Sequence, residues 1–285
     1  MIAVEVMPDA GAPQVGITVS GLGAGSAVIS VEVSWDDGYS WHGVRGVQRV
    51  TVAGGSDFFR DFVPPLNVDA IYRLVVHSGT ASAAGEATIL VPSDVGWIQD
   101  PLNPRAAVPV SGVRGTDALS LMSGTAAAVA RRQAFDAALV EGSRHPVASV
   151  GARQAPANVP VLLRAVLADQ GGFARSLRRL FDEAGTVVLR GLPNDLPLDA
   201  VAHVVAGDVV EVPTPGGVLG VRNDWQLDVT QVRPTSMRLA VPFWTYEQVT
   251  ALWQEALGAG VTYADVEAAR PGDTHLSWAR SPEAS

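Results

Sequence analysis

The sequence predicts a mainly β protein: an N-terminal β-sandwich, a second β domain with one packed helix, and short helices near the C-terminus. Three observations favour this fold class. Apolar and polar residues alternate in several short segments of the first ninety residues, which is the period of a half-buried strand. Gly (29) and Pro (19) are frequent, as expected for turns between strands. The second half contains one clear apolar stripe at helical spacing.

Residues 1–92 are predicted to form the sandwich. Alternation is cleanest at 27–35, and Asp36-Asp37-Gly38 follows as a hairpin turn, because Gly tolerates positive φ. The two aspartates could also contribute to a calcium site, but a solvated turn is favoured. The other expected strands lie at 14–20, 41–52, 57–63, 71–77 and 86–91. About seven short strands with turns between them are typical of a sandwich.

The segment 93–113 is predicted to be a semi-rigid linker or an extended arm, because it contains Pro101, Pro104 and Pro109. Trp97, within this segment, is expected to contact a neighbouring domain or subunit. The second β domain is predicted at 114–236. Its first segment, 126–140, is ambiguous because Ala favours helix, and a strand is preferred there. Further strands are expected at 146–151, 158–167, 186–190, 201–212 and 224–232.

The clearest helix is predicted at 170–184, and Gly185 is expected to end it. Its apolar residues recur at intervals of three and four and form one stripe: Phe173, Leu177, Leu180 and Phe181. In the preceding strand, alternate residues are expected to share one face: Val159, Val161, Leu163 and Ala165. Trp225, at the start of the last expected strand, is a candidate for the core.

The C-terminal segment, 237–285, contains a weak repeat of Thr, an aromatic residue or His, two further residues and an apolar residue. The units begin at Thr245, Thr262 and Thr274. A Thr can cap a helix, so short helices are expected near 246–257 and 263–269. They are too short to be stable alone. Their aromatic residues either anchor them on their own domain or join subunits. The interface candidates are Trp97, Trp244, Tyr246, Trp253, Tyr263 and Trp278.

Composition excludes several classes of function. The net charge is −9 and the basic residues, all of them Arg, are scattered, so no nucleic-acid partner is expected. Cysteine is absent, which excludes disulfides and thiol catalysis. No apolar run is long enough for a membrane helix and the N-terminus lacks a signal peptide. A soluble protein without membrane insertion is expected. The Ala-, Gly-, Val- and Arg-rich composition indicates a GC-rich genome.

Motifs for catalysis are missing. The five histidines show no metal-ligand spacing, and no nucleophile elbow occurs. The glycines at 21–25 precede a strand rather than a helix, and the chain has no Lys for a phosphate loop. Trp35 is expected to pack in the sandwich. We therefore expect no enzyme, no cofactor, and no catalytic, cofactor-binding or metal-binding residue.

Two parts of the chain resemble known families. Leu66 lies six residues before Tyr72, which alternates with Leu74 and Val76 on one strand. This resembles the corner of fibronectin type III domains, in which a Leu enters the core and a Tyr hydroxyl ties down the loop. The resemblance covers about residues 1–92 and implies a sandwich of the fibronectin III or immunoglobulin type.

The second resemblance covers about residues 110–285. The order of 142–147, a strand, the helix 170–184, the strand 185–190 and a strand ending near Val212 resembles the ring-forming split-barrel domain of siphophage distal tail and baseplate-hub proteins. The terminal repeats resemble those of minor tail proteins of phages that infect actinobacteria, although the third unit has His275 for an aromatic residue.

The resemblance implies a minor tail protein, a structural component of the phage tail tip, made in the host bacterial cytoplasm and located in the virion tail. It would form a sixfold or threefold ring of its own copies and contact the tail tube, tape measure and baseplate hub. An alternative is a carbohydrate- or receptor-binding module at the host surface, using Trp41 or Trp97. A cell-wall hydrolase is a third hypothesis, which requires converging carboxylates or a metal.

Overall fold

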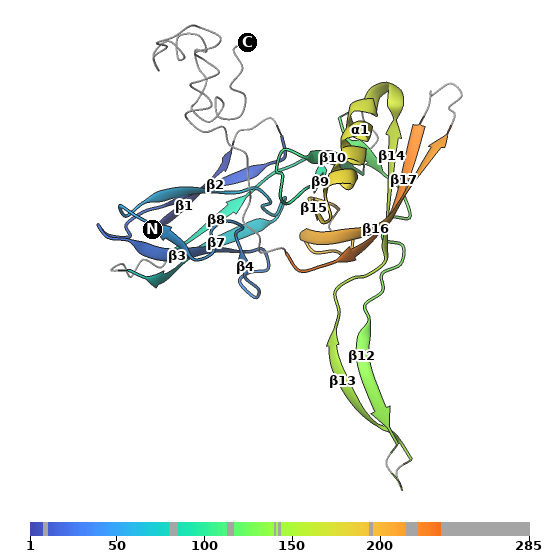
Figure 1. Cartoon of the computed structure of the whole chain (residues 1–285), viewed down its shortest axis with the longest axis horizontal. Helices are drawn as coiled ribbons and strands as arrows, with labels where there is room; N and C mark the ends of the chain where they lie inside the picture. Colours follow the sequence, from blue (N-terminus) through green and yellow to red (C-terminus); the bar gives the residue numbers. More distant parts are fainter. Residues whose placement is uncertain are drawn as a thin grey trace. The chain divides into compact units, whose positions relative to one another are not determined.

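The structure is a computed structural model and is mainly β, as predicted (Figure 1). The described residues, which end at Pro234, belong to one compact unit. The described residues are 1–7, 11–79, 85–112, 117–139, 141, 144–193, 196–214 and 222–234. They contain two hydrophobic cores, one drawn from residues 2–91 and one from residues 98–229. The described part therefore has a sandwich followed by a barrel.

The sandwich core lies between two antiparallel sheets, whose strands all come from residues 2–90. One sheet has the order β1 (Ile2–Met7), β2 (Gln14–Val19), β6 (Asp57–Asp61). The other has the order β4 (His42–Gly43), β3 (Ala27–Ser34), β7 (Asp69–Ser78), β8 (Gly85–Leu90), with β5 (Val50–Val52) also paired to β3. The single strand expected at 41–52 is thus two short strands, separated by a turn with Gly46 at φ 80°.

The turn after β3 forms as predicted. Asp37 and Gly38 both have positive φ, 56° and 85°, the conformation that suits a tight hairpin turn. The Asp36 carboxylate accepts hydrogen bonds from the hydroxyl and the main-chain N–H of Ser40 and from the Ser34 hydroxyl. These bonds, those from Ser40 first, lower the pKa of Asp36 to about 2. The Asp36 carboxylate therefore stabilises this turn.

The predicted Leu66 lies in the connection between β6 and β7 and the predicted Tyr72 lies in β7, and both are buried. The Tyr72 hydroxyl donates to Asp61 Oδ2 at 2.9 Å, and Asp61 Oδ1 accepts the N–H of Val63 at 2.9 Å. The tyrosine thus ties down the loop through a buried carboxylate. Burial raises the pKa of Asp61, and burial with the nearby Asp61 charge raises that of Tyr72.

The second core lies inside a closed barrel. Its strands are antiparallel except for the parallel pair β10 and β11. In spatial order they are β10 (Ala107–Ser111), β11 (Leu119–Leu121), β14 (Val159–Val166), β17 (Arg222–Gln231), β16 (Val201–Thr214), β15 (Val187–Arg190) and β9 (Gly96–Gln99).

The predicted linker at 93–113 is wrong, because β9 and β10 are barrel strands. Pro101 and Pro104 lie in the turn between them. Pro109 lies within β10 at a position paired with β9 alone, since β11 pairs only with Val110 and Ser111. A proline without an N–H is tolerated where a strand has a free side. The barrel therefore begins near residue 96 rather than at 114.

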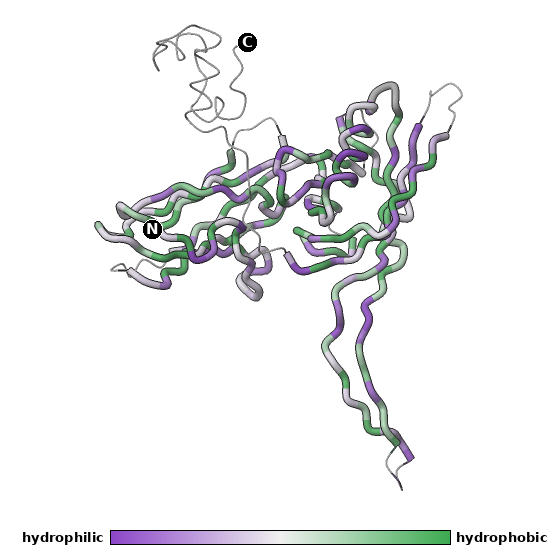
Figure 2. Tube along the Cα trace, in the orientation of Figure 1, coloured by the Kyte–Doolittle hydropathy of each residue, from purple (hydrophilic) through white to green (hydrophobic). Residues whose placement is uncertain are grey.

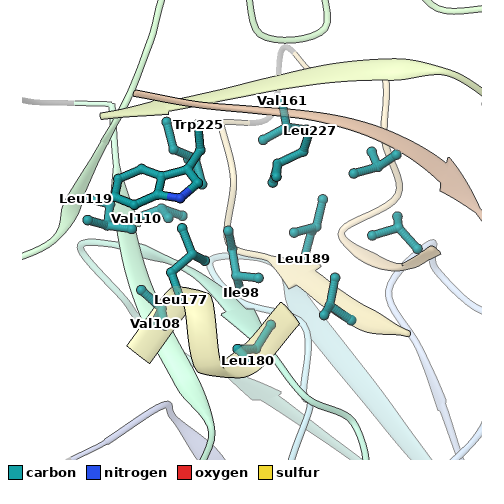
Figure 3. Close-up of a cluster of buried hydrophobic side chains, with 14 of the residues drawn as sticks. Ile98, Val108, Val110, Leu119, Val161, Leu177, Leu180, Leu189, Trp225 and Leu227 are labelled. Carbon is teal, nitrogen blue, oxygen red and sulfur yellow. The ribbon is translucent and has the colours of Figure 1, made fainter. Parts of the chain in front are cut away.

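The barrel core follows the predicted alternation. Val159, Val161, Leu163 and Ala165 of β14 are buried, as are Trp225 and Leu227 of β17. The helix α1 (Leu167–Glu183) adds Leu177 and Leu180 to this core (Figure 3). Phe173 and Phe181 pack against it and are partly buried. The expected helical stripe is therefore confirmed.

The ends of α1 differ from expectation. The helix begins at Leu167, three residues before the expected start, and has non-helical φ and ψ at Gln170. It ends at Glu183, and the next residue, Ala184, is extended and donates its N–H to the carbonyl of Leu180 at 2.8 Å. Gly185 does not have a positive φ, so the expected glycine ending is wrong. The chain then continues into β15.

Within the described residues no helix is long and apolar enough to span a membrane.

A third sheet consists of β12 (Gln133–Ala138) and β13 (Val147–Arg153), an antiparallel hairpin that is not part of the barrel (Figure 1). The strand expected at 146–151 is confirmed. Of the ambiguous stretch 126–140, only the later part is a strand, and Ala126 has a positive φ of 55°. We call this element the β12–β13 hairpin.

Candidate functional site

The predicted interface residues fall into two groups. Five of the six lie outside the described residues: Trp244, Tyr246, Trp253, Tyr263 and Trp278. Trp97 lies in β9, where it packs against the sandwich core of its own chain, and its Nε1 donates to Ser93 Oγ at 3.3 Å. The neighbouring Ile98 points into the barrel core. Trp97 therefore contacts the neighbouring domain, as expected, and it joins the two parts of one chain.

The β12–β13 hairpin presents an apolar face. Phe135 is paired with Val150, and Ala137 with Ala148. Residues directly opposite each other, and residues two apart on one strand, lie on the same face of a sheet. These four residues therefore form one continuous apolar surface, which we call the hairpin apolar face. The pairs Asp136 with Ser149 and Ala138 with Val147 occupy the other face, which is mixed in polarity.

Both faces of this hairpin are exposed. All residues of β13 are exposed, and Phe135 and Val150 retain 72% and 64% of their accessible surface. Figure 2 shows hydrophobic residues along both of its strands. A hairpin of two strands is only marginally stable alone in water, and contiguous exposed apolar side chains mark interaction surfaces. The hairpin apolar face is therefore a candidate protein–protein interface.

A cleft of about 580 Å³ forms a second candidate site. Its walls come from the β3–β4 region of the sandwich and from the ends of β16 and β17 in the barrel. Its aromatic and imidazole groups are Trp35, Trp41, His42 and His203. Its volume falls within the ~300–1,000 Å³ typical of small-molecule sites.

The aromatic side chains of the cleft are held in place. The rings of Trp35 and His42 are stacked, with centroids 4.2 Å apart and 12° between their planes. The Arg73 guanidinium lies 3.8 Å from the centre of the Trp41 ring, and Arg73 Nε donates to Glu32 at 2.7 Å. A cation over an aromatic face is attractive. The orientation of Trp41 is therefore fixed by an ion pair between β3 and β7.

His203, on β16, supplies a buried polar group to the cleft. Its side chain is 8% exposed, and Nδ1 has no hydrogen-bond partner within the described part of the chain. Burial, with the positive charges of Arg45 and His42 as lesser causes, lowers the pKa of His203 to about 4. The imidazole is therefore neutral near pH 7, when one ring nitrogen donates and the other accepts.

Gln231, at the end of β17, supplies a second buried polar atom without a hydrogen-bond partner in the described residues. Its Nε2 donates to the Asp199 carboxylate, while its Oε1 is buried without a hydrogen-bond partner in the described residues. Buried polar atoms are normally hydrogen-bonded. The cleft is thus lined by two residues that each have a buried polar atom without a hydrogen-bond partner in the described part of the chain. Among the described residues, no three His, Asp or Glu side chains are placed to hold a metal ion.

Sequence reasoning named Trp41 as a candidate ligand-binding residue, and Trp41 does line the cleft, but it missed the other residues of the cleft and the hairpin apolar face. His42 and His203 are distant in the chain and meet only because the sandwich packs beside the barrel. The hairpin apolar face had a local signal, since Phe135, Ala137 and Leu139 alternate with other residues. That signal was obscured by the Ala-rich composition, which suits a helix equally well. Comparisons with protein families, curated proteins and solved structures gave no match to this chain.

Proposed function

We propose that this chain is a non-enzymatic structural subunit of a bacteriophage tail tip, a minor tail protein that assembles with its own copies and with other tail proteins. The proposal that the chain assembles with other chains rests on the hairpin apolar face. Phe135 and Val150 lie opposite each other there with most of their surface exposed. Covering them with another chain removes apolar surface from water, at about 25 cal/mol for each Å².

In the proposed ring, the hairpin apolar face of one copy packs against a different surface of the next copy. Such a heterologous contact produces a ring when the rotation closes. The sixfold or threefold symmetry comes from the resemblance to distal tail and baseplate-hub proteins. In a tail tip, a ring of this kind would connect the tail tube and tape measure to the baseplate hub.

The barrel supports the same proposal. Its closed sheet, with α1 packed against the core and lying between β14 and β15 along the chain, has the strand–helix–strand order on which the resemblance rests. A closed barrel has no open sheet edge and is a rigid support for the hairpin. The location in the virion tail remains part of this proposal.

The test combines two mass measurements. Native mass spectrometry of the purified chain at micromolar concentration is expected to give a trimer or a hexamer. Mass spectrometry of purified phage particles from the source is expected to detect the chain as a minor component. A stable monomer that is absent from the particles would contradict the proposal.

A second candidate function is a carbohydrate- or receptor-binding module at the host surface. The cleft favours it, because Trp35 and Trp41 are held in place there beside buried polar atoms without partners. The two functions are compatible, since the hairpin and the cleft use different residues.

A further inference from the structure

We infer that the cleft between the sandwich and the barrel is a binding site for an uncharged saccharide. The inference gives a ligand class to the second candidate function, and it does not depend on assembly through the hairpin. Its basis is the combination of fixed aromatic rings, buried polar atoms without partners and balanced charge in one cleft.

The two buried polar atoms without partners favour a ligand with hydroxyl groups. Gln231 Oε1 can only accept a hydrogen bond, because an amide oxygen carries no hydrogen, and its neighbour Nε2 donates to Asp199. His203 Nδ1 either donates or accepts, depending on the tautomer of the neutral ring. A sugar hydroxyl has one donor and two acceptor positions, so it can satisfy either atom.

The aromatic residues call for a ligand with an apolar face. The C–H groups on one side of a sugar ring form a flat apolar surface that packs on an aromatic ring. Trp41 lines the cleft and is kept in its orientation by Arg73. Trp35 lines it as well and is fixed by its stacking on His42. Rings that are already ordered lose little conformational freedom when a ligand binds.

The charges of the cleft favour a neutral ligand. Arg45 and Arg233 line it together with Asp61 and Asp199, so neither sign is in excess. Arg45 also donates to the main-chain carbonyl of Pro101, and Asp61 accepts from Tyr72. These two charged groups are therefore already engaged within the protein. A nucleotide or an acidic sugar would need an excess of basic groups.

The experiment begins with a glycan array of neutral and acidic saccharides probed with the full chain. The best neutral saccharide is then titrated by isothermal calorimetry. Trp41→Ala and His203→Leu are each expected to weaken its binding at least tenfold. Tyr39→Ala is the matched control, because Tyr39 lies in the same β3–β4 connection, is 92% exposed and does not line the cleft. Its affinity is expected to equal that of the wild type.

Thermal melting separates binding from folding. His203→Leu removes a buried nitrogen that has no partner, so its melting temperature at pH 7 is expected to equal or exceed that of the wild type. Binding that is lost in a fully folded His203→Leu variant supports the inference. Val150→Ser, on the hairpin, is expected to bind the saccharide normally even where it changes assembly.

Three results would overturn the inference. The first is an array on which no neutral saccharide binds, including the case in which a peptide array detects binding instead. The second is binding restricted to acidic saccharides. The third is unchanged affinity in both Trp41→Ala and His203→Leu. Each of these outcomes leaves the proposed assembly through the hairpin untouched, so the two failures are distinguishable.

Discussion

Arg190 of the barrel donates a hydrogen bond to the main-chain carbonyl of Pro64 in the sandwich, with 3.1 Å between Nη1 and the oxygen. Its Nη2 donates to Gln99 Oε1 at 2.9 Å, and Gln99 Nε2 donates to the carbonyl of Phe62 at 3.2 Å. The guanidinium is buried, and that burial lowers the pKa of Arg190 to about 10, while the charge of Asp61 opposes the shift. One buried cation therefore links the barrel to the sandwich.

Replacing this cation is expected to destabilise the protein strongly. Arg190→Leu would leave the Pro64 carbonyl and Gln99 Oε1 without their donor and Asp61 without its nearby positive charge. Breaking a buried ionic network of this kind costs about 3–5 kcal/mol. The free energy of unfolding in urea measures the effect. Arg179→Leu is the control, because Arg179 is exposed and, within the described residues, pairs with Glu183 four residues away, a surface contact whose loss is expected to change stability far less. Equal losses in the two variants would contradict this account.

The buried hydroxyl of Tyr72 gives a second prediction. Tyr72→Phe removes its hydrogen bond to Asp61 and is expected to lower the free energy of unfolding by about 1–3 kcal/mol at pH 7. That bond lowers the pKa of Asp61, so its loss raises the pKa further. The folded variant then binds a proton more readily than the wild type. The destabilisation is therefore expected to shrink as the pH falls.

Chemical denaturation at pH 7 and at pH 4.5 tests this dependence. Tyr39→Phe removes an equally sized hydroxyl from a side chain that is 92% exposed, and it is expected to be neutral at both pH values. A Tyr72→Phe variant whose stability matches the wild type at pH 7 would show that the hydroxyl bond is unimportant.

His203 predicts a loss of stability in acid. Its pKa falls from 6.5 in the unfolded chain to about 4 in the folded protein, mainly because it is buried near Arg45 and His42. The unfolded state therefore binds the proton first as the pH falls below 6.5, and this favours unfolding. The difference of two to three pKa units corresponds to on the order of 3 kcal/mol, lost between about pH 6.5 and pH 4.

His203→Leu removes this contribution, so the variant's stability should fall less than that of the wild type between pH 7 and pH 4. The difference between the two profiles cancels the other titrating groups, Asp61 among them. Parallel profiles would mean that His203 is protonated equally in the folded and unfolded states.

Local patterns predicted much of the fold. The alternation of β14 and the stripe of α1 correctly placed Leu163 and Leu177 in the barrel core. The spacing of Leu66 and Tyr72 correctly indicated a buried corner. In each case the periodicity of one segment was enough, because one face of that segment is buried.

What the sequence could not predict depends on distant pairing. β9 and β10 are short and lie among prolines, and only their pairing with β15 and β11 makes them barrel strands. Arg190 is the last residue of an apolar strand, and its buried position depends on Pro64 in the other domain. The cleft has the same cause, since Trp41 and His203 belong to different domains. The burial of Arg190 and the placement of Trp41 beside His203 therefore could not be predicted from the pattern of any one segment.

The most direct test of assembly compares two valines of β13. Val150 lies on the hairpin apolar face and Val147 on the opposite face, and they are almost equally exposed, 64% and 63%. Burial of one Val contributes about 1.5–3 kcal/mol, so its loss at a subunit contact weakens association roughly tenfold or more. Sedimentation velocity of the wild type, Val150→Ser and Val147→Ser measures the effect. We predict oligomers for the wild type and Val147→Ser, and a shift toward monomer for Val150→Ser. A monomeric wild type, or the same distribution for both variants, would contradict the account.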